Sequence, residues 1–317
     1  MRRLVRIFLI LVFVPPAFAA IVGWLVGPAF LHPIRRELSP GLVREADSAF
    51  AFLRAHREDF DIRAPDGVLL RGWKVRPPKP NGNWVLLFHG VADNRVGVLS
   101  QAELLLREGF SVVMMDSRAH GASEGPMATY GWLERNDTRA IVAALENTEH
   151  PRHLFALGES MGAGIALQSA AVEPRIEGVV AEASFANLTE AAYDYAGLRR
   201  YPWLGKTLLA PGAWMMVYRG QSLAGFPAAE VSPEKSVAAR DFPVLLICDT
   251  DDVALPCRHT EMIYSAAVGP RQMWVVPRAF HTAALAYQPA EFRRRVLAFY
   301  ESAAPVQLSA KPQQAPQ

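Results

Sequence analysis

Six short apolar runs, separated by segments with helical periodicity, constrain the fold of this 317-residue chain more than any other feature. The runs occupy residues 84–88, 111–115, 153–157, 179–181, 244–247 and 273–276. Nearly continuous apolar runs of this length are typical of parallel strands, because helices cover both faces of the sheet. Helix-period segments lie between or after the runs, for example 138–145, 163–172 and 291–300. The alternation predicts an α/β fold with a doubly wound, mostly parallel sheet.

Two segments before the first run have a different pattern. Residues 60–64 and 69–75 alternate apolar and polar side chains around Pro65-Asp66-Gly67. Alternation around such a turn sequence is typical of a hairpin with half-exposed strands. We therefore expect the sheet to have an antiparallel start.

One connection between core strands is unusually long. About 57 residues, from 185 to 241, separate two apolar runs, whereas crossovers in such sheets are short. We interpret this insertion, about residues 186–241, as a helical lid over the site; the alternative is an extra helical layer whose aromatic side chains pack into the body. Ser232-Pro233-Glu234 predicts the start of a helix within it. The insertion is rich in aromatic and methionine residues, namely Tyr193, Tyr195, Tyr201, Trp203, Trp214, Met215, Met216 and Tyr218.

Residues 1–40 are expected to form a membrane anchor or a signal segment. Residues 7–31 carry no charge, and as a helix these 25 residues would reach roughly 37 Å, enough to cross a hydrocarbon core of about 30 Å. Ala17-Phe18-Ala19 matches a signal cleavage site, but the apolar character continues to Leu31, so we favour an uncleaved anchor over a cleaved signal. Pro15-Pro16 would kink or locally break this helix.

The charges around the apolar segment indicate its orientation. Arg2, Arg3 and Arg6 precede it, which favours an inside N-terminus and places the body of the protein outside the cytoplasm. Gly23 and Gly27 form a pair that could let two such segments pack closely, although a single pair of this kind is more often coincidental.

Composition excludes some classes of function. The formal net charge is +2, which does not supply the electrostatic basis for binding nucleic acid. Two cysteines are too few for a disulfide scaffold or a zinc site, and no cofactor or metal is expected. The C-terminal residues 303–317 are rich in Pro, Gln and Ala and are predicted to be disordered.

A Gly-x-Ser-x-Gly sequence, Gly158-Glu159-Ser160-Met161-Gly162, follows one apolar run and precedes a helical segment. A turn between strand and helix that is this tight needs glycines beside the serine and exposes its hydroxyl. We therefore predict Ser160 to be a nucleophile. The amide of Met161, at the helix N-terminus, is placed to stabilise an oxyanion.

Two further groups complete the predicted triad. His281 follows the last apolar run, at the edge where catalytic loops of such sheets gather, and is predicted to be the general base. Asp252 follows the run 244–247 and is the preferred acid; Asp249 and Asp251 are the alternatives, otherwise expected to cap turns or to be solvated. His89 and His120 also lie at strand exits, where side-chain hydrogen bonds that stabilise turns are expected.

Five motifs in order give a resemblance to the α/β-hydrolase superfamily, in particular to its lipase/esterase, monoglyceride-lipase-like and serine-aminopeptidase-like branches. They are His89-Gly90, the segment 116–125 with Asp116, Arg118, His120, Gly121, Ser123 and Gly125, the Gly158–Gly162 sequence, Asp252 with Leu255-Pro256, and His281. The resemblance covers residues 60–300 and implies an eight-stranded, mostly parallel sheet with helices on both faces in a domain 41–302. It also implies that the Val91 amide joins Met161 in the oxyanion hole.

One departure concerns the acid strand, because many relatives carry His-Gly where this chain has Cys248-Asp249. Cys248 and Cys257 flank the acid loop; a disulfide between them would fix Asp252, and two buried free thiols are the alternative.

The expected function is that of a serine hydrolase that cleaves an ester or thioester. The aromatic insertion and the apolar N-terminal segment favour an apolar or lipid-derived acyl substrate. A serine aminopeptidase or amidase on the same triad is the alternative, and a non-catalytic binding protein with this fold is a further one.

Overall fold

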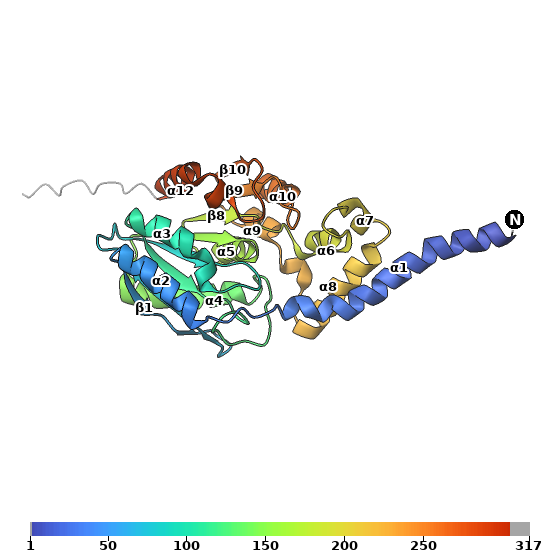
Figure 1. Cartoon of the computed structure of the whole chain (residues 1–317), viewed down its shortest axis with the longest axis horizontal. Coiled ribbons are helices and arrows are strands. Elements are labelled where there is room, and N and C mark those ends of the chain that lie inside the picture. The colour runs from blue at the N-terminus through green and yellow to red at the C-terminus, as the bar shows by residue number, and fades with distance from the viewer. Residues whose placement is uncertain (1, 305–317) are drawn as a thin grey trace, which may run out of the picture.

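The computed structural model describes residues 2–304, except for the side chains of residues 7–11. Its centre is an eight-stranded sheet in the order β1-β4-β6-β5-β7-β8-β9-β10 (Figure 1). The strands are β1 (His56–Asp59), β4 (Gly72–Arg76), β5 (Asn83–Phe88), β6 (Ser111–Met115), β7 (His153–Glu159), β8 (Gly178–Glu182), β9 (Val244–Asp249) and β10 (Arg271–Val276). The strands from β6 to β10 pair in parallel, and β4 pairs antiparallel with β1 and β6. The predicted mostly parallel sheet is confirmed, with all six apolar runs as strands.

Helices cover both faces of the sheet and create two hydrophobic cores. One core lies beneath α2 (Pro40–Phe52), η1 (Arg95–Val98), α3 (Leu99–Arg107), α11 (Ala284–Tyr287) and α12 (Pro289–Ala303). The other lies beneath α4 (Glu134–Glu149), α5 (Met161–Val172), α9 (Pro233–Ala239) and α10 (Arg258–Ala266). Successive residues of β5 alternate between the two cores, because successive side chains of a strand point to opposite faces. Both faces are therefore apolar, which explains the nearly continuous apolar runs.

The antiparallel start differs in part from the prediction. A short hairpin forms, in which β2 (Ile62–Arg63) pairs with β3 (Leu69–Leu70). The segment after it, β4, instead joins the main sheet and is buried rather than half-exposed. Lys74 in β4 is buried because its ammonium pairs with Glu149 and with Glu58. Lys74 makes the sequence of β4 alternate between apolar and polar residues. The alternation therefore resembles that of a half-exposed strand, although β4 is buried.

The N-terminal segment forms one helix, α1 (Arg2–Leu31), without a break at Pro15-Pro16. Residues Val12–Leu31 have a mean hydropathy of 1.7 and are long and apolar enough to cross a membrane. The helix extends away from the body of the molecule (Figure 1). Its last turn is nevertheless part of the body, because Leu31 is fully buried and its carbonyl accepts a hydrogen bond of 2.8 Å from the Ala128 amide.

The long insertion after β8 contains the helices α6 (Leu188–Ala196), α7 (Pro202–Lys206), α8 (Ala210–Ala224), η2 (Ala228–Glu230) and α9. The predicted start of α9 is confirmed, since Ser232 Oγ accepts a hydrogen bond of 3.1 Å from the Lys235 amide. Helices α6, α7 and α8 stand beside the body together with α1 (Figure 1), and we call these four helices the helical lobe. Trp203 and Trp214 are 65% and 57% exposed, so these aromatic side chains do not pack into the body.

The predicted disordered tail begins where α12 ends, at Ala303. Its residues 305–317 lie outside the described part of the chain.

Candidate active site

The structure brings together the three residues that the sequence placed in a triad. His281 Nε2 lies 2.9 Å from Ser160 Oγ, and His281 Nδ1 lies 2.6 Å from Asp252 Oδ2. Ser160 follows β7, Asp252 follows β9 and His281 follows β10, so all three lie at the carboxyl edge of the parallel strands. The Asp252 side chain is fully buried, whereas 32% of the His281 side chain is exposed. The imidazole is therefore open to a substrate on one side and held by a carboxylate on the other.

Ser160 occupies the sharp turn between β7 and α5. Its φ is 54°, in the left-handed region that non-glycine residues rarely adopt. A Cβ at Gly158 would lie 2.3 Å from the Gly162 carbonyl oxygen, and one at Gly162 would lie 2.2 Å from the Phe88 carbonyl oxygen. Both positions require glycine, as the motif predicts. The turn leaves the Ser160 hydroxyl directed toward His281.

The loop after β9 fixes the carboxylate of Asp252. Its Oδ1 accepts hydrogen bonds from the amides of Ala254 and Leu255, at 2.7 and 2.9 Å, while Oδ2 faces the imidazole. Because three N–H groups surround the carboxylate, its two oxygens are held in one orientation.

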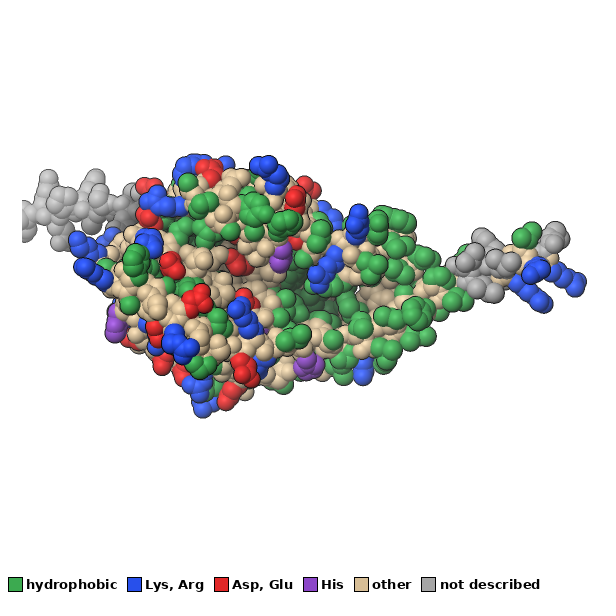
Figure 2. All heavy atoms as spheres, in the orientation of Figure 1, with side chains coloured by type: hydrophobic (Ala, Val, Ile, Leu, Met, Phe, Trp, Pro, Cys, Tyr) green, Lys and Arg blue, Asp and Glu red, His purple; other side chains and the backbone are tan. Residues whose placement is uncertain are grey.

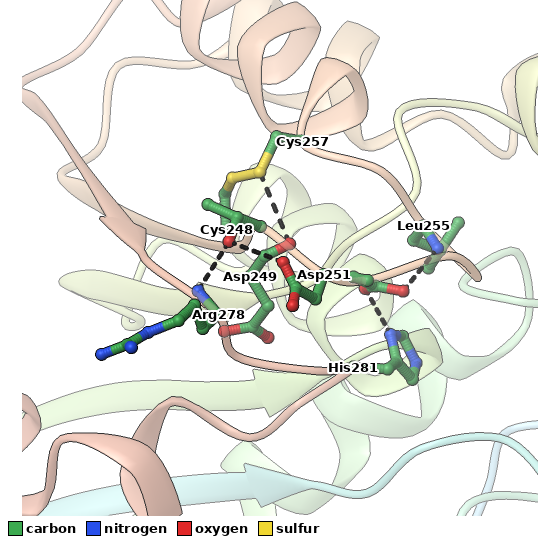
Figure 3. Close-up of a disulfide and its surroundings, with 9 residues drawn as sticks. Cys248, Asp249, Asp251, Leu255, Cys257, Arg278 and His281 are labelled. Atoms are coloured by element: carbon green, nitrogen blue, oxygen red, sulfur yellow. Dashed lines mark hydrogen bonds and ion pairs between the residues drawn. A yellow bond between two sulfur atoms is a disulfide. The ribbon is translucent and has the colours of Figure 1, made fainter.

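Cys248 and Cys257 form a disulfide, with their Cα atoms 5.2 Å apart. The structure therefore has the disulfide and not two buried free thiols. Figure 3 shows the disulfide at the base of the acid loop and His281 on its far side. The bridge ties β9 to the residue before α10, so it closes the loop that carries Asp252.

The two amides expected to bind an oxyanion lie beside Ser160. Met161 is the first residue of α5, where helix N–H groups have no acceptor within the helix. A Cβ at Gly90 would lie 3.6 Å from Ser160 Cβ, which places the His89-Gly90 turn, and Val91 directly after it, next to the nucleophile. Val91 and Met161 therefore both lie close to Ser160, and their role as an oxyanion hole stays a prediction.

His89 and His120 form turn-stabilising hydrogen bonds, as expected. His89 Nε2 accepts from the Ser117 amide at 3.0 Å, and His120 Nδ1 lies 2.9 Å from the Arg118 carbonyl oxygen. Burial lowers the pKa of His89, and burial together with the neighbouring His89 lowers the pKa of His120 to about 4. Both rings are therefore neutral and hold the loop beneath the site.

Sequence reasoning missed a cluster of buried carboxyl groups beneath the triad. Glu159, Glu182 and Asp249 are the last residues of β7, β8 and β9. Burial raises the pKa of Glu159 to about 8 and that of Asp249 to about 6, and it raises the pKa of Glu182 well above its ordinary value. Asp249 is buried, so the expectation that it is solvated is wrong. Its carboxyl lies against Glu182 and the backbone amides of Thr282 and Ala283. Asp251, by contrast, is exposed.

Glu182 connects Ser160 with the loop after His281. Its carbonyl oxygen accepts a hydrogen bond of 2.9 Å from the Ser160 amide. Its side chain accepts one of 2.8 Å from the Ala284 amide, three residues after His281. The signal that could have revealed it is its position, since an acidic residue at the end of a buried strand meets the loops that carry the site.

The described part of the chain, residues 2–304, contains no group of three or more His, Cys, Asp or Glu side chains arranged to hold a metal ion.

Comparison with known proteins gives relatives over most of the chain. Residues 79–218 match the family model described as "Hydrolase_4: Serine aminopeptidase, S33". The uncharacterized protein YqkD of Bacillus subtilis is 29% identical over 290 residues, which cover 87% of this chain and 92% of that protein.

Solved structures share the fold. The Pyrococcus furiosus esterase Pf2001 is 23% identical, with a TM-score of 0.68 over 86% of this chain and 99% of that one. The esterase EaEST from Exiguobacterium antarcticum is 15% identical, with a TM-score of 0.57 over 77% of this chain and 100% of that one. Together with the sheet topology, these likenesses show that the chain has the α/β-hydrolase fold.

Proposed function

We propose that the protein is a serine hydrolase that cleaves an ester or thioester of an apolar acyl group through an acyl-enzyme. The hydrogen-bonded series Asp252–His281–Ser160 carries this proposal, because a serine becomes a nucleophile when an oriented imidazole can take its proton. The two esterases that share the fold support it.

The geometry supports the following sequence of steps. Ser160 Oγ attacks the carbonyl carbon of the substrate while His281 Nε2 takes the hydroxyl proton. Asp252 stabilises the resulting imidazolium, and the amides of Val91 and Met161 stabilise the oxyanion. The tetrahedral intermediate collapses, and the alcohol or thiol leaves with the proton from His281. Water, deprotonated by His281, then attacks the acyl-enzyme, releases the carboxylic acid and restores the Ser160 hydroxyl.

An aminopeptidase or amidase on the same triad is a second candidate, favoured by the description of the matching family model. A peptide N-terminus is an ammonium group, which calls for a carboxylate free to bind it. In the insertion, however, Glu190 pairs with Lys206 and Arg258, and Asp194 pairs with Arg258 and lies 2.6 Å from His259 Nε2. From residue 195 to residue 229 the chain has no acidic side chain. These observations favour an uncharged apolar substrate.

We further propose that α1 is a retained anchor and that the catalytic domain lies outside the cytoplasm. Leu31 is buried in the body, and Tyr130 Oη donates a hydrogen bond of 2.7 Å to the Phe30 carbonyl oxygen, so α1 continues into the fold. The disulfide supports an oxidising compartment. Cleavage after Ala19 remains the alternative, and N-terminal sequencing of the membrane-bound protein distinguishes the two.

A fluorophosphonate probe tests whether the chain is a hydrolase. We expect the folded protein to be labelled, the Ser160→Ala variant to be unlabelled, and Ser265→Ala, a change of an exposed serine on α10, to be labelled like the wild type. Folded protein that resists labelling would instead indicate a binding protein that retains the hydrolase fold.

A substrate panel tests the bond that is cleaved. Hydrolysis rates are compared for p-nitrophenyl esters of increasing acyl length, the matching thioesters and aminoacyl anilides. We expect kcat/KM to be highest for an ester or thioester. A preference for the anilides would overturn the ester proposal and leave the triad assignment intact.

A further inference from the structure

The helical lobe exposes more large apolar side chains than a surface in water ordinarily does. Six of them, on or between α7 and α8 and on the loop before them, are between 39% and 75% exposed, and we call them the apolar face: Leu198, Trp203, Leu208, Trp214, Tyr218 and Leu223. Figure 2 shows hydrophobic side chains gathered over this lobe, next to α1. An apolar surface of this extent on a soluble domain is typical of a binding surface.

Helix α1 lies directly against α8. A Cβ at Gly23 would lie 2.0 Å from the Gly212 carbonyl oxygen, and one at Gly27 would lie 2.9 Å from the Met216 carbonyl oxygen. A Cβ at Gly220 would lie 2.2 Å from the Phe30 ring. Small residues on both helices therefore allow this close contact, as between helices within membranes. Gly23 and Gly27 thus serve a contact inside the chain rather than one between two chains.

The direction of the two helices places α8 at the depth of the anchor. Positions 23, 27 and 30 of α1 meet positions 212, 216 and 220 of α8, so the helices run parallel over this stretch. The same residues of α1 belong to the segment Val12–Leu31, which is long and apolar enough to cross a membrane. If that segment lies in a bilayer, α8 lies in or at the surface of the same bilayer.

Aromatic and basic residues of the lobe suit the boundary between lipid and water. The Trp24 and Tyr218 rings stack at 6.5 Å, and the Arg219 guanidinium lies 4.5 Å from the Trp24 ring. Tryptophan and tyrosine are enriched at this boundary, because one end of each ring is apolar and the other is polar. Residues 195–229 contain four basic and no acidic side chains, which favours anionic headgroups: Arg199, Arg200, Lys206 and Arg219.

A groove between α1 and the insertion also suits contact with lipid. Its volume is about 410 Å³, and its lining is apolar, with Phe18, Val22 and Val26 on one side and Tyr195, Leu209 and Met216 on the other. A groove formed partly by the anchor opens to lipid wherever the anchor is embedded. Acyl chains of the bilayer are therefore the occupant that its position and lining fit.

We propose that the apolar face enters the lipid bilayer together with α1, as a second and non-spanning membrane contact that favours anionic lipid. The partner is the bilayer and not a second copy of the chain, since the glycine pair of α1 is already covered by α8. This inference rests on the proposal that α1 is a retained anchor. It is independent of the proposed hydrolysis, because it concerns where the lobe lies and not what Ser160 does.

Site-specific labelling of the full-length chain tests the proposal. The two native cysteines are disulfide-bonded, so an introduced cysteine supplies a unique thiol for a nitrobenzoxadiazole dye. Leu198→Cys and Trp203→Cys report on the apolar face. Val268→Cys is the control, because Val268 is 59% exposed and precedes β10, at the amino edge of the sheet and outside the helical lobe.

The labelled proteins are reconstituted into vesicles of phosphatidylcholine with and without phosphatidylglycerol. On anionic vesicles we expect dyes at positions 198 and 203 to emit at shorter wavelength, to be quenched by nitroxide-bearing lipids and to resist bleaching by dithionite, whereas the dye at 268 does none of these. Reversing the charge of Arg199, Arg200 and Lys206 to glutamate should reduce the protection. The proposal would be overturned if dyes on the lobe bleached as fast as the dye at position 268. It would also be overturned if the lobe dyes were protected from dithionite but not quenched by nitroxide-bearing lipid, because this would indicate contact with a second protein copy.

Discussion

At the scale of single residues, each member of the triad is positioned by a different local contact. Ser160 is held by a strained backbone, Asp252 by two amides of its own loop, and His281 by the carboxylate of Asp252. Glu182 links the loop after His281 to the nucleophile turn. Their relative positions therefore depend on contacts that do not touch a substrate.

The first prediction concerns Asp252. Replacing it with Asn keeps the shape but presents a neutral group to His281, so the preferred tautomer and the stabilisation of the imidazolium are lost. We expect kcat to fall by about 10⁴-fold, as for triad acids in general. Asp251→Asn, at an exposed neighbouring position, should leave kcat unchanged. A similar loss in both variants would move the acid role away from Asp252.

A second prediction concerns Glu182 as a positioning residue. Burial raises its pKa well above the ordinary value, which favours the neutral form, and Gln is a close neutral substitute. Glu182→Gln should keep kcat, because the amide oxygen can still accept from the Ala284 amide. Glu182→Ala should lower kcat with little change in KM. If the Gln variant loses as much as the Ala variant, the carboxyl group itself takes part in the reaction.

From the sequence, the residues that come together can be predicted more reliably than the surroundings of each residue. Ser160, Asp252 and His281 each follow an apolar run, and parallel strands bring such positions to one edge. Asp249 also follows a run, but whether its carboxylate is solvated depends on the loops that cover it, here the one after His281. Those loops come from distant parts of the chain, so the buried group could not be identified from local pattern.

At the scale of elements, the turn between β7 and α5 depends on backbone space. Gly162→Ala would place a Cβ 2.2 Å from the Phe88 carbonyl oxygen, so α5 or β5 must shift. A displacement of the nucleophile by about 1 Å can cost about 10²-fold in rate, and we expect at least that loss together with a lower Tm. Gly41→Ala in α2 meets no atom closer than 3.6 Å and should leave the rate unchanged.

The disulfide is predicted to stabilise the acid loop. By the chain-entropy model, closing so short a loop contributes about 2–3 kcal/mol, so the double variant Cys248→Ala, Cys257→Ala should lower the free energy of unfolding by that amount. Its kcat should fall as well, because the loop that holds Asp252 is no longer tied to α10. Thiol titration of the denatured wild type without reductant should detect no thiol; two thiols would contradict the bridge.

The contact between α1 and α8 in the helical lobe could not be predicted from the sequence pattern of either helix. The sequence reveals the apolar segment and its glycine pair, but not what the glycines face. Their partners, Gly212 and Met216, are about 190 residues away and belong to a helix whose own pattern is weakly amphipathic. The contact depends on the register of two helices, which only the folded chain specifies.

At the scale of the whole molecule, the three buried carboxyl groups make stability depend on pH. Each has a pKa above its ordinary value, so the folded protein retains protons that the unfolded chain has released. The stability that these three groups contribute is therefore lost as pH rises from about 4 to about 8, by at most about 1.4 kcal/mol per pH unit for each group. The lowered pKa values of His89 and His120 act in the opposite sense below about pH 6.5.

Thermal unfolding at a series of pH values measures this dependence. Between pH 5 and pH 8, Glu159→Gln should lose less Tm per pH unit than the wild type. The reason is that the variant lacks the carboxyl group whose pKa in the fold is about 8. Glu45→Gln, at an exposed site on α2, should unfold with the same pH profile as the wild type. If Glu159→Gln instead unfolds with the same pH profile as the wild type, the Glu159 carboxyl is already ionised in the fold over this interval.

The last turn of α1 is joined directly to the body by hydrogen bonds of the Phe30 and Leu31 carbonyl oxygens. With the anchor embedded, the reacting hydroxyl would keep a constant height and tilt above the lipid surface. Such an enzyme would encounter substrates that diffuse laterally within its own leaflet. Its rate would therefore depend on their surface density in the membrane and not on their concentration in solution.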